Sequence, residues 1–264
     1  MSKTIALLSA ALVCLLPRST ASIRAQEPQA HPDFTGVYYT FNPDAAGRGR
    51  AAAPPGAAGA RGTAAAPPRP VPVIDGRAGR PATAPKLRPE YLARWEVMRK
   101  SRMAGSSDTD PNANCLSAGM PSMMGMGYGM EIQHTKDKVT IYGELNDVYR
   151  RIFLDGRKPS QRTLDDPTFA GYSVGHWEGD TLVVDTVALR EDTLLDLFSP
   201  HSDQLTVHES MRFTSPGILE DRTTATDPKA LLEPFTQVHT YRKASPPNDE
   251  LREFSCAEGL KSTK

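Results

Sequence analysis

The segment EIQHTKDKVTIYGELNDVYRRIFL, residues 131–154, contains three short runs of β-forming residues joined by two tight-turn sequences. The runs are Glu131–Thr135, Lys138–Glu144 and Val148–Leu154, and each is rich in β-branched or aromatic side chains. Lys, Asp and Asn residues supply the turns between them. Connections this short favour antiparallel hairpins, because a parallel crossover needs a dozen or more residues. The segment therefore predicts an antiparallel meander.

The same pattern extends along most of the chain. Further strands are expected at Asp33–Phe41, Tyr172–Glu178, Thr181–Ala188, Leu205–Phe213, Ile218–Ala225, Thr236–Tyr241 and Glu250–Ser255. One helix is expected near 88–103, since Pro89 stands at its first turn and an apolar stripe follows. So many strands must hide their edges, which favours a mainly β fold that closes as a barrel or a sandwich with lipocalin-like architecture.

The N-terminus has the pattern of a secretory signal peptide over residues 1–25. Lys3 precedes the apolar run Ile5–Leu16, which is too short to span a bilayer, and small residues follow up to Ala25. Cys14 raises the alternative of a lipid anchor, but Val13 stands where lipoprotein processing requires a small residue. We therefore expect a periplasmic or secreted protein without stable membrane insertion.

The stretch Pro43–Lys86 differs in composition from the rest of the chain. It contains 14 Ala, 9 Pro and 7 Gly and almost no large apolar side chains, so we expect a disordered insertion. The domain layout is then a strand at 33–42, this insertion, a helix-plus-β domain at 87–258 and a tail at 259–264. The insertion carries seven basic and two acidic residues, whereas the whole chain balances 31 Lys and Arg against 31 Asp and Glu. The zero net charge argues against nucleic-acid binding.

Two cysteines remain after removal of the signal peptide, Cys115 and Cys256. An even number in an exported chain predicts a disulfide, with two buried thiols as the alternative. Neither lies in a Cys-x-x-Cys motif, so redox catalysis and thiolate metal sites are not expected.

Two further motifs carry weaker implications. Gly171-Tyr-Ser-Val-Gly175 matches the serine nucleophile pattern, but a hairpin follows where that motif needs a helix, so Ser173 is expected to be an ordinary strand residue. The methionine-rich stretch Met120–Met130 is expected to be an adaptable apolar lining, with Cu(I) binding as the alternative. No cofactor is predicted, and a zinc site built from distant histidines is a minor possibility.

Charged residues inside the predicted strands mark a candidate ligand site. Burial of a charge is costly unless it is paired, so an inward-facing group needs a partner or a ligand. In the run Val148–Leu154, the alternation places Arg150 with Val148 and Ile152, and Arg151 with Tyr149 and Phe153. The residues expected to bind a ligand are Arg157, Glu144, Asp185, Glu209, His176, Met124 and Tyr128.

The loop Asp192–Asp203 between two strands is the candidate catalytic segment. His201 is the residue there whose ordinary pKa lies near neutrality, as a general acid or base requires. Asp196 is close enough in sequence to orient its imidazole, and Arg151 could bind a carboxylate or a developing oxyanion. The alternative is a polar capping loop in which His201 is bonded to backbone.

The string Gly171-Tyr-Ser-Val-Gly-His-Trp-Glu-Gly-Asp-Thr-Leu-Val-Val-Asp-Thr186, with Asp155-Gly-Arg157 before it, resembles a widespread group of exported bacterial proteins. The resemblance covers most of residues 33–258 outside the insertion. The group has no settled function and transfers no catalytic residue. Similar sequences read Asp-Gly-Arg-x-His-Pro where this chain has Asp155-Gly-Arg-Lys-Pro-Ser160, so no histidine-dependent role is expected at that place.

Three functions fit these features. The first is an exported β-domain that binds a small organic molecule in an internal cavity. The second is a cofactor-free acid–base enzyme, a lyase, isomerase or hydrolase, that acts on a small oxygenated substrate in the same cavity. The third is an envelope interaction protein that uses the basic insertion. The sequence does not indicate the ligand or the oligomeric state.

Overall fold

The computed structural model describes residues 31–41, 84–106, 108–196, 198–252, 254 and 256. The expected signal peptide at 1–25, all but residues 84–86 of the expected insertion at 43–86, and the tail at 259–264 lie outside the described residues. Residues His31 onward form one compact unit.

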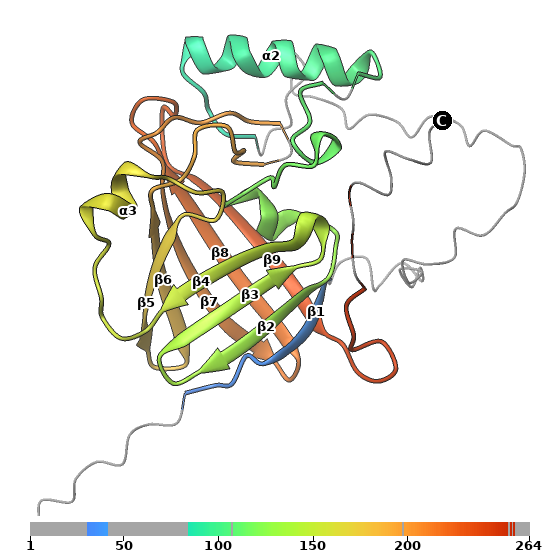
Figure 1. The fold of residues 1–264 in the computed structure, drawn as a ribbon, viewed down its shortest axis with the longest axis vertical. Coiled ribbons are helices and arrows are strands. Elements are labelled where there is room, and N and C mark those ends of the chain that lie inside the picture. The colour runs from blue at the N-terminus through green and yellow to red at the C-terminus, as the bar shows by residue number, and fades with distance from the viewer. Residues whose placement is uncertain are drawn as a thin grey trace, which may run out of the picture. The chain divides into compact units, whose positions relative to one another are not determined.

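Nine strands form a closed barrel in which successive strands are neighbours and β1 closes the ring against β9 (Figure 1). This closure decides between the barrel and the sandwich. The strands are β1 Gly36–Thr40, β2 Met130–Thr135, β3 Lys138–Gly143, β4 Val148–Phe153, β5 Tyr172–Glu178, β6 Thr181–Val187, β7 Thr206–Ser215, β8 Ile218–Thr226 and β9 Phe235–Lys243.

Closure of a nine-stranded ring imposes one exception to antiparallel pairing. Around a closed ring the strand direction must return to its starting value, so the number of antiparallel pairs is even. Eight pairs are antiparallel, as the sequence predicts, and the ninth, β4 with β5, is parallel. The connection between these two strands is long enough for a parallel crossover and contains the short helix α3 Gln161–Asp165.

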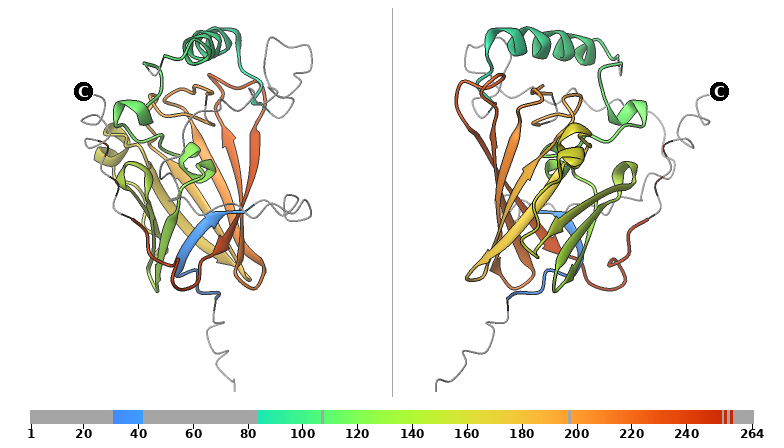
Figure 2. Two further views of the ribbon diagram at one scale, coloured as in Figure 1. Left: turned by 90° about the vertical axis from the view of Figure 1, so that its right-hand side faces the viewer. Right: turned by 60° about the vertical axis from the view of Figure 1, so that its left-hand side comes forward.

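The helix α2 Pro89–Met103 lies across one end of the barrel (Figures 1 and 2). It buries Tyr91 and Trp95, which are four residues apart and therefore share one face. The segment before it is anchored by pairing of Leu87 with Leu231, which lies in the loop between β8 and β9. Three short 3-10 helices, η1 Asn112–Asn114, η2 Ser122–Gly125 and η3 Leu145–Asp147, lie in the connections on either side of β2 and β3.

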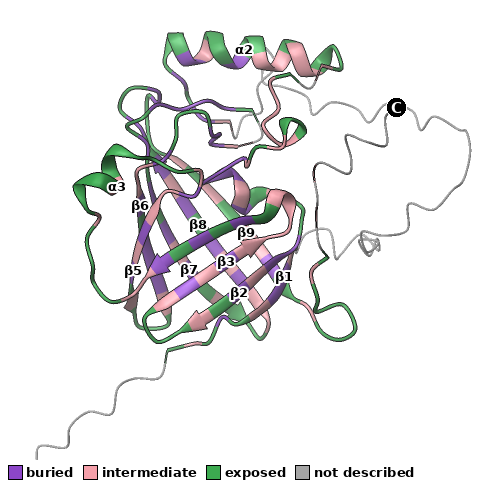
Figure 3. Ribbon diagram, in the orientation of Figure 1, coloured by how far each residue is buried: buried purple, intermediate pink, exposed green. Residues whose placement is uncertain are grey.

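The hydrophobic core fills the barrel interior with one face of each strand. Burial alternates along the strands (Figure 3), so that Val139 and Ile141 of β3 and Ile152 of β4 are fully buried. Phe34, before β1, packs edge-on against Phe213 of β7 with ring centroids 5.1 Å apart. The segment that precedes β1 lies at the end of the barrel opposite α2 (Figure 1).

The predicted disulfide between Cys115 and Cys256 is confirmed, with Cα atoms 5.6 Å apart. Such a bond is typical of an oxidising compartment outside the cytoplasm. The predicted strand Glu250–Ser255 is wrong, because its described residues have no strand pairing. The barrel is already closed by the pairing of β1 with β9.

Candidate functional site

A buried polar cluster occupies the middle of the barrel. Arg150 is fully buried, and its guanidinium donates two hydrogen bonds to the Glu209 carboxylate, one of them 2.9 Å long. It also donates to the Ser173 hydroxyl at 3.2 Å and to the Thr186 hydroxyl at 3.1 Å. These four residues come from β4, β5, β6 and β7, so the cluster ties four strands together across the interior.

Asp221 is a second carboxyl group beside this ion pair. It is fully buried, and its Oδ2 accepts a hydrogen bond of 3.1 Å from Thr223, while Oδ1 has no partner among the described residues. Burial, followed by the nearby charge of Glu209, raises the pKa of Asp221 well above its usual range. When Asp221 is protonated, Arg150 and Glu209 form a pair of balanced charge.

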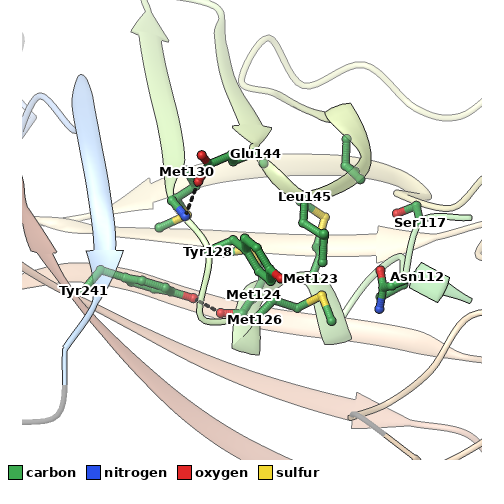
Figure 4. A pocket seen from close by; sticks show the side chains of 14 residues that line it. Asn112, Ser117, Met123, Met124, Met126, Tyr128, Met130, Glu144, Leu145 and Tyr241 are labelled. Carbon is green, nitrogen blue, oxygen red and sulfur yellow. Dashed lines mark hydrogen bonds between the residues drawn. The ribbon is translucent and has the colours of Figure 1, made fainter. Parts of the chain in front are cut away.

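The methionine-rich stretch closes the barrel interior near the start of β2. Met120 and Met124 are buried, and the Tyr241 hydroxyl of β9 donates a 2.5 Å hydrogen bond to the carbonyl oxygen of Met124. The cavity beneath this stretch has a volume of about 30 Å³ (Figure 4). It is lined by Met123, Met124, Met126, Tyr128, Met130, Glu144, Tyr241 and seven others, and it has room for about one water molecule.

A much larger space lies in the wall of the barrel, between β4 and the segment that precedes β5. The parallel ladder joins only Ile152 with Ser173 and Phe153 with Val174. Before β5, the chain pairs instead with residues that follow β6, through a bridge from Thr168 to Leu189. The first half of β4 is therefore left without a partner on this side, and a cleft of about 560 Å³ opens there. We call it the wall cleft.

The wall cleft is lined by aromatic, polar and charged side chains. They are Cys115, Leu116, Ser117, Asn146, Asp147, Val148, Tyr149, Arg151, Phe153, Thr163, Asp166, Thr168, Phe169, Ala170, Gly171, Tyr172 and Ala188. A Cβ atom at Gly171, whose φ is +67°, would lie 2.7 Å from Thr186 and 2.8 Å from the carbonyl oxygen of Val187. Glycine is thus needed where the chain turns away from β4 to open the cleft.

The backbone around the wall cleft holds unusual conformations. All four non-glycine residues with positive φ among the described residues line it, namely Cys115, Asn146, Asp147 and Ala188. Such conformations cost free energy and gather at functional sites when the surrounding structure enforces them. Here the enforcing contacts include the Asn146 side-chain amide, which donates to the carbonyl oxygen of Leu116 at 2.9 Å.

The three predicted catalytic residues do not form one site. His201 is buried, its Nδ1 donates to the carbonyl oxygen of Ser202 at 2.8 Å, and its Nε2 lies 2.7 Å from the hydroxyl of Thr193. Burial lowers the pKa of His201, so the imidazole is neutral and has both nitrogens occupied. Asp196 accepts from the backbone of its own turn, and Arg151 lies on the outer face of β4. His201 therefore belongs to a polar capping loop in which it is bonded to backbone, the alternative to a catalytic role.

A different carboxylate organises this loop. Asp227 is buried and accepts hydrogen bonds from the backbone and hydroxyl of Ser202 and from the backbone of Lys229 and Ala230. Asp196 was the expected carboxylate because it is close to His201 in the sequence. The observed contact joins Ser202 to Asp227, which is 25 residues away.

The predicted ligand-binding residues separate into three groups. Glu209 faces the interior, as its position among apolar residues predicts, and there it binds Arg150. Met124, Tyr128 and Glu144 line the small cavity, where Oε2 of Glu144 accepts from the backbone of Gly129 at 3.2 Å. The remaining three are exposed, so their expected place in an interior cavity is wrong. Asp185 pairs with His208, His176 with Glu178, and Arg157 with Asp155.

Sequence reasoning missed Arg150 and, apart from Arg151, the lining of the wall cleft. The alternation in β4 did place Arg150 on the same face as the apolar Val148 and Ile152, which was the available indication that it faces inward. Asp221 could have been found in the same way, because the period-two alternation places it on the same buried face of β8 as Leu219 and Thr223. The wall cleft has no such indication, since it arises from pairing between distant segments.

The described residues contain no group of three or more His, Cys, Asp or Glu side chains placed to hold a metal ion. Likewise, none of the described helices is long and apolar enough to cross a lipid bilayer.

Comparison with known proteins gives no family assignment. No family model matches the chain, and no curated protein matches it. Four solved chains match, and one of them is the crystal structure of the fluorescent protein UnaG N57A mutant. That chain is 16% identical, with a TM-score of 0.28, over 52% of this chain and 89% of the other. With so low a TM-score, the assignment of a barrel rests on the strand pairing described above.

Proposed function

We propose that this protein is an exported β-barrel that binds a small organic molecule in the wall cleft. The apolar N-terminal segment with its small-residue cleavage region and the Cys115–Cys256 disulfide support export to an oxidising compartment.

The observation that carries the binding proposal is the contrast between the two spaces. The cavity beneath the methionine-rich stretch has a volume of about 30 Å³. Arg150, Glu209, Met120 and Met124 are themselves buried in the barrel. The wall cleft has about 560 Å³, within the range of roughly 300–1,000 Å³ that small-molecule sites occupy. The proposed site therefore moves from the interior to the wall.

Pre-organisation of the wall cleft is a second support. Its rim is joined by the Asn146 hydrogen bonds to Leu116 and Asn112, and it is anchored to the C-terminal segment by the disulfide at Cys115. A site that is formed before its ligand arrives loses less conformational entropy on binding. A binding role needs no catalytic group, and the cleft lining contains no histidine among the described residues.

The test is to fill the wall cleft without disturbing the barrel. Leu116 lines the cleft and is 44% exposed, whereas Leu232 is 59% exposed and lies in the loop between β8 and β9, outside the cleft. Leu116→Trp should block the cleft, and Leu232→Trp is the matched control.

Protein from its own host is measured by native mass spectrometry and is also screened against neutral and charged fragments by saturation-transfer NMR. Wild type and Leu232→Trp should bind small molecules that Leu116→Trp does not bind. The proposal is overturned if wild type binds none, or if Leu116→Trp binds the same compounds equally well.

A further inference from the structure

We propose that the wall cleft selects an aromatic monocarboxylate, whose carboxylate is bound by Arg151. This inference rests on the proposed function and names the chemical class of its ligand. The inference is argued from an arginine without an acidic partner and from the aromatic side chains beside it on the outer face of β4.

Arg151 is a cation without an acidic partner at the wall cleft. It forms no ion pair or hydrogen bond through its side chain with any residue that the structure describes, and it lines the cleft. Two neighbouring arginines are already occupied: Arg157 pairs with Asp155, and Arg190 pairs with Asp192. A free guanidinium presents a planar fork of donors that matches a carboxylate in two parallel hydrogen bonds.

Aromatic pairs flank Arg151 along the strand. On one side the rings of Tyr142 and Tyr149 have centroids 4.8 Å apart, and on the other Phe153 and Tyr172 are 5.3 Å apart. Tyr149 and Phe153 are each two residues from Arg151, which places them on its face at roughly 7 Å along the strand. The Arg157 guanidinium already lies over the Phe153 ring, 4.1 Å from its centroid. A ligand whose carboxylate meets Arg151 can therefore lay a planar ring against the Tyr142–Tyr149 pair.

The acidic residues of the cleft set the charge of the ligand. Asp147 accepts a 2.5 Å hydrogen bond from the Tyr142 hydroxyl, and this bond raises the pKa of Tyr142. Asp166 lines the cleft and is exposed. Asp166 forms no ion pair with any described residue, so a second anionic group of the ligand placed beside it would be repelled. A hydroxyl group there could instead donate to Asp166, so the site favours a monoanion.

The probes are 4-hydroxybenzoate, its neutral amide 4-hydroxybenzamide, the non-aromatic cyclohexanecarboxylate and the dianion terephthalate. Dissociation constants are measured by isothermal titration calorimetry with the full mature chain. We expect 4-hydroxybenzoate to bind more tightly than each of the other three. A charge-assisted bidentate contact predicts a loss of ~10- to 100-fold for the amide.

Arg151→Gln tests the anion contact, and Arg222→Gln is its matched control. Arg222 is an exposed arginine on β8 that does not line the cleft. Arg151→Gln should weaken 4-hydroxybenzoate by the same ~10- to 100-fold and leave the amide unchanged, whereas Arg222→Gln should change neither. Arg151→Lys should recover only part of the affinity, because an ammonium group lacks the planar fork.

The failure of this inference can be told apart from failure of the proposed function. If the amide binds as tightly as the carboxylate, or if Arg151→Gln binds the carboxylate like wild type, the ligand class is wrong. If no acid binds but neutral fragments bind and are excluded by Leu116→Trp, the class is again wrong and the wall cleft remains the binding site. If no fragment of any class binds, both proposals fail.

Discussion

Replacement of Arg150 by methionine should lower the free energy of unfolding far more than the same replacement at Arg151, the next residue. The Arg150 guanidinium makes four hydrogen bonds and is the counter-charge of Glu209, and both side chains are 0% exposed. Arg150→Met leaves the Glu209 carboxylate buried and unpaired. Removal of one partner from a buried ion pair costs about 3–5 kcal/mol.

The free energy of unfolding of a typical protein is roughly 5–15 kcal/mol, so this loss is a large part of it. For a domain of this size it corresponds to a fall in melting temperature of roughly 6–20 °C. Arg151→Met, on the outer face of β4, should change the free energy of unfolding by less than about 0.5 kcal/mol. Urea unfolding followed by circular dichroism, with the disulfide intact, measures both.

The double variant Arg150→Met, Glu209→Leu separates a lost ion pair from a lost side chain. It removes both charges together, so it should be more stable than Arg150→Met alone, because no uncompensated charge stays in the interior. The hydroxyls of Ser173 and Thr186 keep each other as partners at 2.8 Å. The reasoning is refuted if Arg150→Met costs no more than Arg151→Met, or if the double variant loses the sum of the two single losses.

Three further outcomes are expected. Asp221→Asn should stabilise the protein increasingly as the pH rises from 4 to 8. The pKa of Asp221 is higher in the folded protein than its ordinary value of 3.8. Its contribution to the free energy of unfolding is therefore fully present below pH 3.8 and is lost at higher pH, where the carboxyl group ionises in the unfolded chain. Urea midpoints of wild type and variant that stay parallel across this range would contradict it. Replacement of Cys115 and Cys256 by alanine opens a loop spanning 141 residues in sequence, and should cost at most about 4–5 kcal/mol in thermal melts; no change would show that the bond is dispensable. His201→Ala should lower the free energy of unfolding by ~2–4 kcal/mol without changing ligand affinity in the wall cleft, and a specific loss of binding would restore its predicted role in the site.

All nine barrel strands lie close to their predicted positions, because period-two alternation and turn residues are local properties of the chain. The same alternation placed Glu209 inside the barrel. It also grouped Arg150 with apolar residues, which indicated that Arg150 and not Arg151 faces the interior. The disulfide could be predicted from the count of cysteines alone, because only one pair remains after the signal peptide.

The parallel pairing of β4 with β5 and the wall cleft were decided by the tertiary structure. The parity of a nine-stranded ring is a property of the whole barrel, and no single stretch of the chain contains it. The role of His201 was decided in the same way, since its burial depends on segments that fold over it from other parts of the chain. Local sequence thus determined the strands, the turns and the faces of the strands. The barrel closure determined which polar residues became core and where a ligand-sized space remained, because both depend on contacts between segments far apart in the sequence.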